Sequence, residues 1–205
     1  WSSLVVNIMH NQELFDHLFD FSCAYINSPE NEVTTEFLMS LPTFLESEMF
    51  GQQHLEKFIP VLTEFLSYTS PDDEESKIII DAAIYSLTCL FIKLPETTQN
   101  STLLTIWYSS LPLRGKKDPC FQKVYDVLVQ LVSQNNPIIL GNLHHLLTII
   151  AKAMKEYNAS NQAQASFEQI VKQLFETPQI KDQFCQELNQ LTHHKKERIL
   201  SLIHE

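Results

Sequence analysis

Apolar residues recur every three or four positions along most of the chain, which is the spacing of one buried face of an α-helix. Pro, Asn, Asp and Ser interrupt this pattern repeatedly, and such residues mark helix ends and turns. A regular alternation of apolar and polar residues is absent and Gly numbers only 3, so we expect no strands. The pattern predicts about ten helices, at residues 12–27, 32–49, 52–69, 73–94, 101–110, 118–134, 142–157, 162–176, 180–191 and 194–204.

Short links separate several of the predicted helices, among them residues 28–31, 70–73 and 134–137. A short link makes successive helices antiparallel, so the structural unit is a helical hairpin. Grouped in pairs, the helices form roughly five hairpins of about 40 residues, the period of HEAT and armadillo repeats. The predicted fold is therefore all-α, a right-handed α-solenoid of about five HEAT-type antiparallel helix pairs. We expect residues 1–205 to form one such segment.

The hairpin at residues 58–91 resembles a HEAT repeat in more than its length. Pro60 lies within its first helix, an acidic turn follows, and Asp81 precedes Ala82 and Ala83 in its second helix. In a HEAT repeat an Asp tends to cap the turn, and a pair of small residues lets the second helix approach its neighbours closely. An arbitrary helical hairpin is the alternative interpretation.

Four consecutive acids, Asp72 to Glu75, stand directly before the apolar run of the fourth predicted helix. They could bind a metal, bind a basic partner or begin the helix. A metal site would need carboxylates one turn apart, but the position one turn after Asp72 is occupied by Ser76. We interpret the acids mainly as residues that bind the free backbone N–H groups of the first turn and favour its positive end.

Charge and composition narrow the class of protein. The net charge of −11 disfavours a nucleic-acid surface and attracts basic partners at long range. The longest apolar segment, residues 78–94, is interrupted by Asp81 and Lys93, so no membrane span is expected. The chain begins at Trp1, from which we expect it to be part of a longer protein. Widely spaced cysteines are expected to be reduced thiols, as in the cytosol or nucleus: Cys23, Cys89, Cys120 and Cys185.

Motifs for catalysis or metal binding are missing from the sequence. The adjacent pairs His144-His145 and His193-His194 cannot form a zinc-binding helix face, because neighbours in a helix point about 100° apart. No Cys-x-x-Cys, His-Glu-x-x-His or Gly-x-Ser-x-Gly motif occurs. We therefore predict no catalytic, cofactor-binding or metal-binding residue, and we do not expect an enzyme.

Two further segments have specific interpretations. Trp107 is predicted to be a packing residue of its hairpin, because Leu103, Leu104 and Ile106 surround it with apolar side chains. The segment around it is apolar on most sides, as expected either for a helix packed between others or for one that lines an apolar groove.

At the end of the chain, the basic cluster at residues 193–198 is predicted to be the polar cap of the last repeat, with a docking site as the alternative.

Residues 103–141 combine several specific features. These are Trp107, the run Ser110-Leu111-Pro112-Leu113, the charged insert at 114–118, the amphipathic helix after it, and Asn135-Asn136-Pro137 before Leu140-Gly141. In these features the segment resembles the C-terminal part of the β-karyopherins, the importin-β superfamily of nuclear transport receptors, and within it the importin-five-like branch. The residues after Tyr157 depart most from this family, because they are polar and rich in Gln.

This resemblance implies a fragment of a nuclear import receptor that shuttles between cytoplasm and nucleus through the nuclear pore. Such receptors bind basic cargo, including ribosomal proteins, release it when they bind the Ran GTPase, and contact Phe-Gly nucleoporins. The main Ran contacts of the family lie in N-terminal repeats that precede the segment seen here. No cofactor, direct nucleic-acid contact or membrane contact is implied. A HEAT-repeat scaffold for protein complexes unrelated to transport is the alternative.

Two acidic residues are the candidates for contact with basic cargo. Glu75 and Asp126 each lie on the more polar side of a predicted second helix, and in the family such helices line the concave face that holds cargo. Glu56, on a first helix, serves as the comparison, because a carboxylate outside that face should matter less. The alternative is that both candidates are simply solvated.

Overall fold

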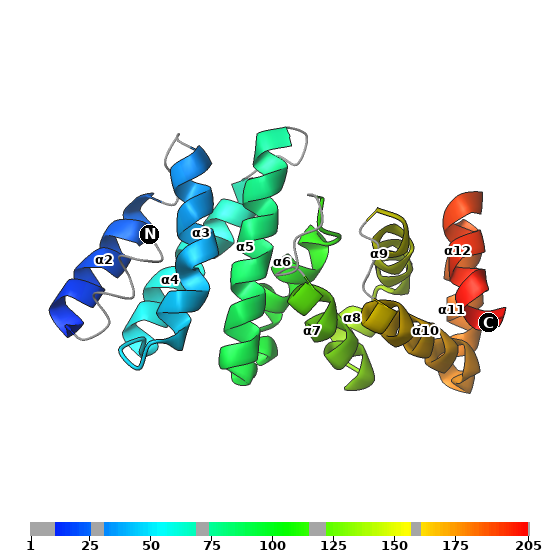
Figure 1. Cartoon of the computed structure of the whole chain (residues 1–205). Coiled ribbons are helices and arrows are strands. Elements are labelled where there is room, and N and C mark those ends of the chain that lie inside the picture. The colour runs from blue at the N-terminus through cyan, green and yellow to red at the C-terminus, as the bar shows by residue number, and fades with distance from the viewer. Residues whose placement is uncertain (1–10, 26–30, 69–73, 115–121, 157–160, 205) are drawn as a thin grey trace. The chain divides into compact units, whose positions relative to one another are not determined.

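The computed structural model describes residues 11–25, 31–68, 74–114, 122–156 and 161–204, and among these residues it contains helices and no strand (Figure 1). The all-α prediction is therefore confirmed for this part of the chain. In order, the helices are α2 (Gln12–Tyr25), α3 (Asn31–Glu46), α4 (Gln52–Tyr68), α5 (Glu74–Lys93), η1 (Pro95–Gln99), α6 (Ser101–Ser110), α7 (Gln122–Ser133), α8 (Pro137–Leu140), α9 (Leu143–Glu156), α10 (Asn161–Glu176), α11 (Pro178–Gln190) and α12 (His193–His204).

The ten predicted helices all correspond to observed ones, and α6 has the predicted bounds. Two short elements were not predicted, the 3₁₀ helix η1 and the single turn α8. Both have Pro at their first position, where its fixed φ and missing N–H suit a helix start. Elements of four and five residues are too short to show a hydrophobic period, which is why the pattern did not reveal them.

The link between α7 and α8 shows how local sequence ends one helix and begins the next. Asn135 has a φ of 55°, in the left-handed region that Asn tolerates, and the N–H of Asn136 donates to the carbonyl of Leu131 at 3.0 Å. The side chain of Asn136 then accepts a hydrogen bond from the N–H of Ile138 at 3.0 Å and caps α8. The predicted turn at this link is therefore a helix stop followed directly by a helix start.

The chain packs as two compact units, Trp1–Ser110 (unit 1) and Leu111–Glu205 (unit 2). In unit 1, α2 contacts α4 and α4 contacts α6, while α3 contacts α5. Alternate helices therefore pack side by side in two layers, as in stacked helical hairpins. A continuous right-handed stack over residues 1–205 involves both units together and stays a prediction.

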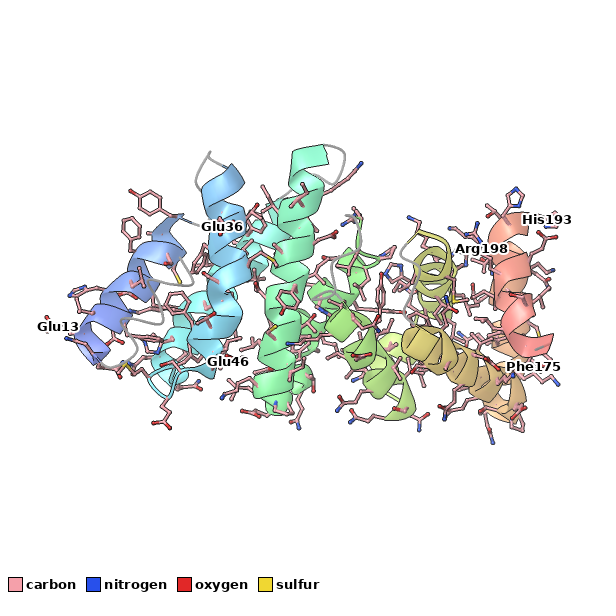
Figure 2. The ribbon with its side chains drawn as sticks, viewed as in Figure 1. Glu13, Glu36, Glu46, Phe175, His193 and Arg198 are labelled. Carbon is pink, nitrogen blue, oxygen red and sulfur yellow. The ribbon has the colours of Figure 1, made fainter. Side chains whose placement is uncertain are left out.

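Unit 2 begins in the same way and then departs from it. Helix α10 contacts α7, and α11 contacts α9, but the last helix, α12, contacts α9, α10 and α11. Arg198 of α12 donates from Nη1 to the carbonyl of Ala151 in α9 at 3.1 Å, whereas His193 lies exposed at the start of α12 (Figure 2). Only part of the basic cluster is therefore available as the predicted polar cap, because Arg198 contributes to packing.

The core of unit 1 surrounds α5. Every residue from Ile79 to Phe91 is buried, including Asp81, which lies well inside the helix. Ala82 and Ala83 are also fully covered, and their small side chains fit the close contact that α5 makes with α3. A hydrogen bond also joins these two helices, because Ser86 of α5 donates from Oγ to the carbonyl of Leu38 in α3 at 2.6 Å.

Trp107 is a packing residue, as predicted. Its side chain is completely buried, and its ring meets that of Phe91 edge to face with centroids 5.6 Å apart. Its Nε1 donates to Thr88 Oγ1 at 2.9 Å, and Thr88 in turn donates to the carbonyl of Ile84 at 2.8 Å. The indole N–H is therefore satisfied inside the core, which burial of Trp requires.

Candidate protein-binding surface

Charged residues are divided very unevenly between the two units. Residues 1–110 hold 16 Asp and Glu against 3 Lys and Arg, a net charge of −13. Residues 111–205 hold 9 Asp and Glu against 11 Lys and Arg, a net charge of +2. The acidity of the chain is thus a property of unit 1.

Most acids that the structure describes in unit 1 point into solvent. Figure 2 shows Glu13, Glu36 and Glu46 projecting from α2 and α3. Carboxylates spread over several helices produce a negative potential that attracts cations over a distance of about a Debye length, roughly 8–10 Å. The exposed acids of the described part are Glu13, Asp20, Glu36, Glu46, Glu48, Glu56, Glu64 and Glu96.

A buried histidine joins α2 to α4 beneath this surface. The side chain of His54 is 1% exposed, and its Nε2 lies 2.9 Å from Oδ1 of Asp16. Its Nδ1 accepts the backbone N–H of Gly51 at 3.0 Å, so the ring proton is on Nε2 and is donated to Asp16. The rings of Phe15 and Phe19 stand edge-on to the imidazole, with centroids 5.2 and 4.9 Å away. Both ring nitrogens are occupied, so His54 acts as an interhelical link and has no free nitrogen to serve as a general base.

The groups beside His54 have shifted pKa values. Desolvation alone would raise the pKa of Asp16, but hydrogen bonds from Gln12 and His54 hold it below its ordinary value. Lys57 contacts both carboxylate oxygens of Asp20, at 2.6 and 2.9 Å, and this hydrogen bonding raises the pKa of Lys57. Burial, with a contribution from Asp20, raises the pKa of the Cys23 thiol to about 12, so this cysteine is no nucleophile at neutral pH.

The link between His54 and Asp16 was not predicted from the sequence. The sequence feature that could have indicated the link is the matching spacing of acids and bases. Asp16 and Asp20 are one turn apart on α2, and His54 and Lys57 are one turn apart on α4. That spacing places two acids opposite two bases only if the helices lie side by side. The pairing therefore depends on the packing of α2 against α4.

The two acids predicted to face cargo, Glu75 and Asp126, belong to different units. Glu75 belongs to α5 in unit 1, but its side chain lies outside the described residues, as do Asp72 and Asp73 of the predicted helix start. Asp126 is exposed on α7 in unit 2 and accepts a hydrogen bond from Gln122 at 3.2 Å. The comparison residue Glu56 is exposed on α4. No shared surface of Glu75 and Asp126 is therefore described, and their role in binding cargo stays a prediction.

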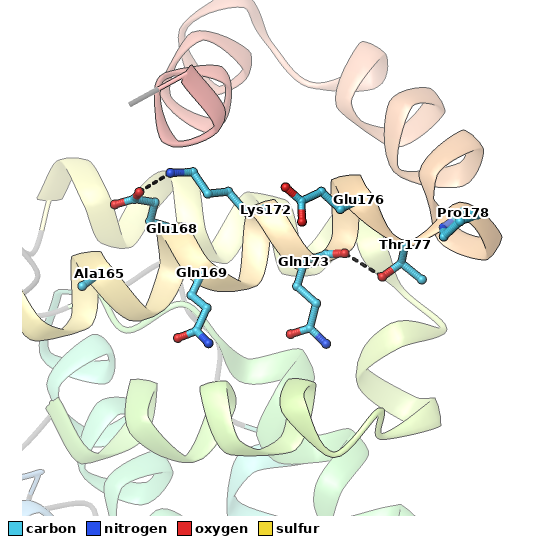
Figure 3. Close-up of a pocket in the computed structure, with 8 residues that line it drawn as sticks. All are labelled: Ala165, Glu168, Gln169, Lys172, Gln173, Glu176, Thr177 and Pro178. Atoms are coloured by element: carbon cyan, nitrogen blue, oxygen red, sulfur yellow. Dashed lines mark hydrogen bonds and ion pairs between the residues drawn. The ribbon is translucent and has the colours of Figure 1, made fainter.

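An open polar depression of about 800 Å³ runs along α10 in unit 2 (Figure 3). Gln169 and Gln173 project on one side of the helix, and Glu168, Lys172 and Glu176 project on the other. Lys172 pairs with Glu168 one turn away. The depression is wide and lined mainly by one helix, so it offers little enclosure for a small molecule, for which binding sites are usually concave and apolar.

Two histidines of unit 2 lie close to carboxylates. His144 Nδ1 lies 3.4 Å from Oε2 of Glu187, and His193 Nδ1 lies 3.3 Å from Oε1 of Glu197. Within the described ranges, no three His, Cys, Asp or Glu side chains are grouped so that they could hold a metal ion. None of the helices described has the length and apolar character needed to cross a membrane.

No known protein family matches this chain, and no curated protein matches it either. The exposed acids of unit 1 are the feature of the described structure that most indicates a binding function.

Proposed function

We propose that this chain is a helical-repeat protein that binds Lys- and Arg-rich protein segments through unit 1. The observation that carries the proposal is the excess of 16 acidic over 3 basic residues in residues 1–110, with the described acids mostly exposed. A surface of this kind accelerates encounter with cationic partners and repels acidic ones. A layered stack of helices also offers a long surface for extended partners.

We further propose that the binding serves nuclear import, with basic cargo such as ribosomal proteins or other proteins that bear nuclear localisation signals. The resemblance of residues 103–141 to the β-karyopherins supports this narrower proposal. Phe-Gly nucleoporins and the Ran GTPase would then be partners of the full receptor, which moves between cytoplasm and nucleus. The alternative is a HEAT-repeat scaffold that binds basic partners outside transport.

A charge-reversal experiment tests the general proposal. The probe is a polybasic peptide in which Lys and Arg are spaced by Gly and Ser, and its association with the chain is followed by fluorescence anisotropy at several salt concentrations. Glu36→Lys with Glu46→Lys should slow association several-fold, and the effect should shrink as salt is raised. The matched control is Glu176→Lys with Asp182→Lys on the exposed surface of unit 2, which makes the same change in net charge and should change association little.

The outcomes separate the alternatives. Absence of salt-sensitive binding, or equal losses in the unit 1 and unit 2 variants, would overturn the proposal that unit 1 is the binding surface. Capture of a Phe-Gly repeat peptide by the same chain supports the transport role. Binding of the polybasic peptide without any binding of Phe-Gly peptide favours the scaffold.

A further inference from the structure

We draw no further inference here: the strongest candidate, the open polar depression along α10 that Gln169 and Gln173 line, is an exposed face of one helix, and nothing in the structure shows what covers it.

Discussion

Units 1 and 2 are built from similar helices but differ in charge and in core composition. The described core of unit 1 is rich in aromatic rings, whereas that of unit 2 is mainly Leu, Ile and Val. In unit 1, rings such as Phe15 and Phe44 meet edge to face, with centroids 5.5 Å apart. The largest fully buried aromatic side chains of unit 1 are Phe15, Phe19, Phe37, Phe44, Phe58 and Trp107, and those of unit 2 are Phe167 and Phe184.

The comparison shows which property the fold requires. Contacts between alternate helices occur in both units, at net charges of −13 and +2, so the strong acidity of unit 1 is not needed to form them. Repulsion among like charges works against a compact state, although it keeps a protein soluble. The excess of acid in unit 1 is therefore the difference between the units that a function best explains.

The largest effect is expected from the aromatic core of unit 1. Trp107→Ala should destabilise the chain by about 3–5 kcal/mol, because it leaves a large cavity beside Phe91. Leu147→Ala, at a fully buried position of unit 2, should cost about 2–5 kcal/mol through the cavity alone. Urea denaturation followed by circular dichroism measures both.

Trp107→Phe sharpens this comparison. It keeps an aromatic ring but removes the hydrogen bond to Thr88, and should cost about 1–2 kcal/mol. If Trp107→Ala leaves the free energy of unfolding unchanged, the aromatic core is not what stabilises unit 1.

A smaller effect is expected from the link between α2 and α4, and it depends on pH. The pKa of Asp16 is lowered below its ordinary value of 3.8 in the folded chain, so its contribution to stability is present above that value and is lost as pH falls through the folded pKa. Asp16→Asn still accepts a hydrogen bond from His54 but carries no charge. The variant should be less stable than the wild type at pH 7, and the difference should shrink as pH falls and vanish once the pH is below the folded pKa of Asp16.

Thermal unfolding of wild type and Asp16→Asn from pH 2 to 7 measures this dependence. The control is Asp182→Asn, at an exposed acid of unit 2, which should follow the wild-type curve. A constant difference between Asp16→Asn and wild type at every pH would mean that the charge of Asp16 does not stabilise the link.

The smallest effect is expected from single charge reversals. The cargo-facing prediction expects Glu75→Lys and Asp126→Lys each to slow association of a Lys/Arg-rich cargo about two- to threefold at low salt, and Glu56→Lys to do less. Binding by unit 1 alone predicts instead that Asp126→Lys has the smallest effect of the three. Stopped-flow kinetics at increasing salt concentration measures the change. Equal effects at all three positions would show that only net charge matters, whereas no effect at any position would place the cargo elsewhere.

Much of the fold was predictable because helix boundaries depend on local signals. Turn residues and the hydrophobic period located ten helices, and the buried Trp107 followed from the apolar residues around it. The candidate site was less predictable. The acids at 72–75 are adjacent in the sequence and are easily recognised. The exposed acids of unit 1, by contrast, are spread over several helices, from Glu13 to Glu96. Their common effect is visible only when charge is counted within a unit defined by packing.

By itself, the sequence determined the helices, their short links and the absence of catalytic motifs, because these depend on residues near one another in the chain. Only the tertiary structure decided which apolar face of α2 is buried, since Phe15 and Phe21 are equally apolar. It also decided that His54 meets Asp16, a contact across 38 positions that no local pattern encodes. Both depend on how α2 packs against α3 and α4, because burial and pairing are properties of neighbouring helices and not of one segment alone.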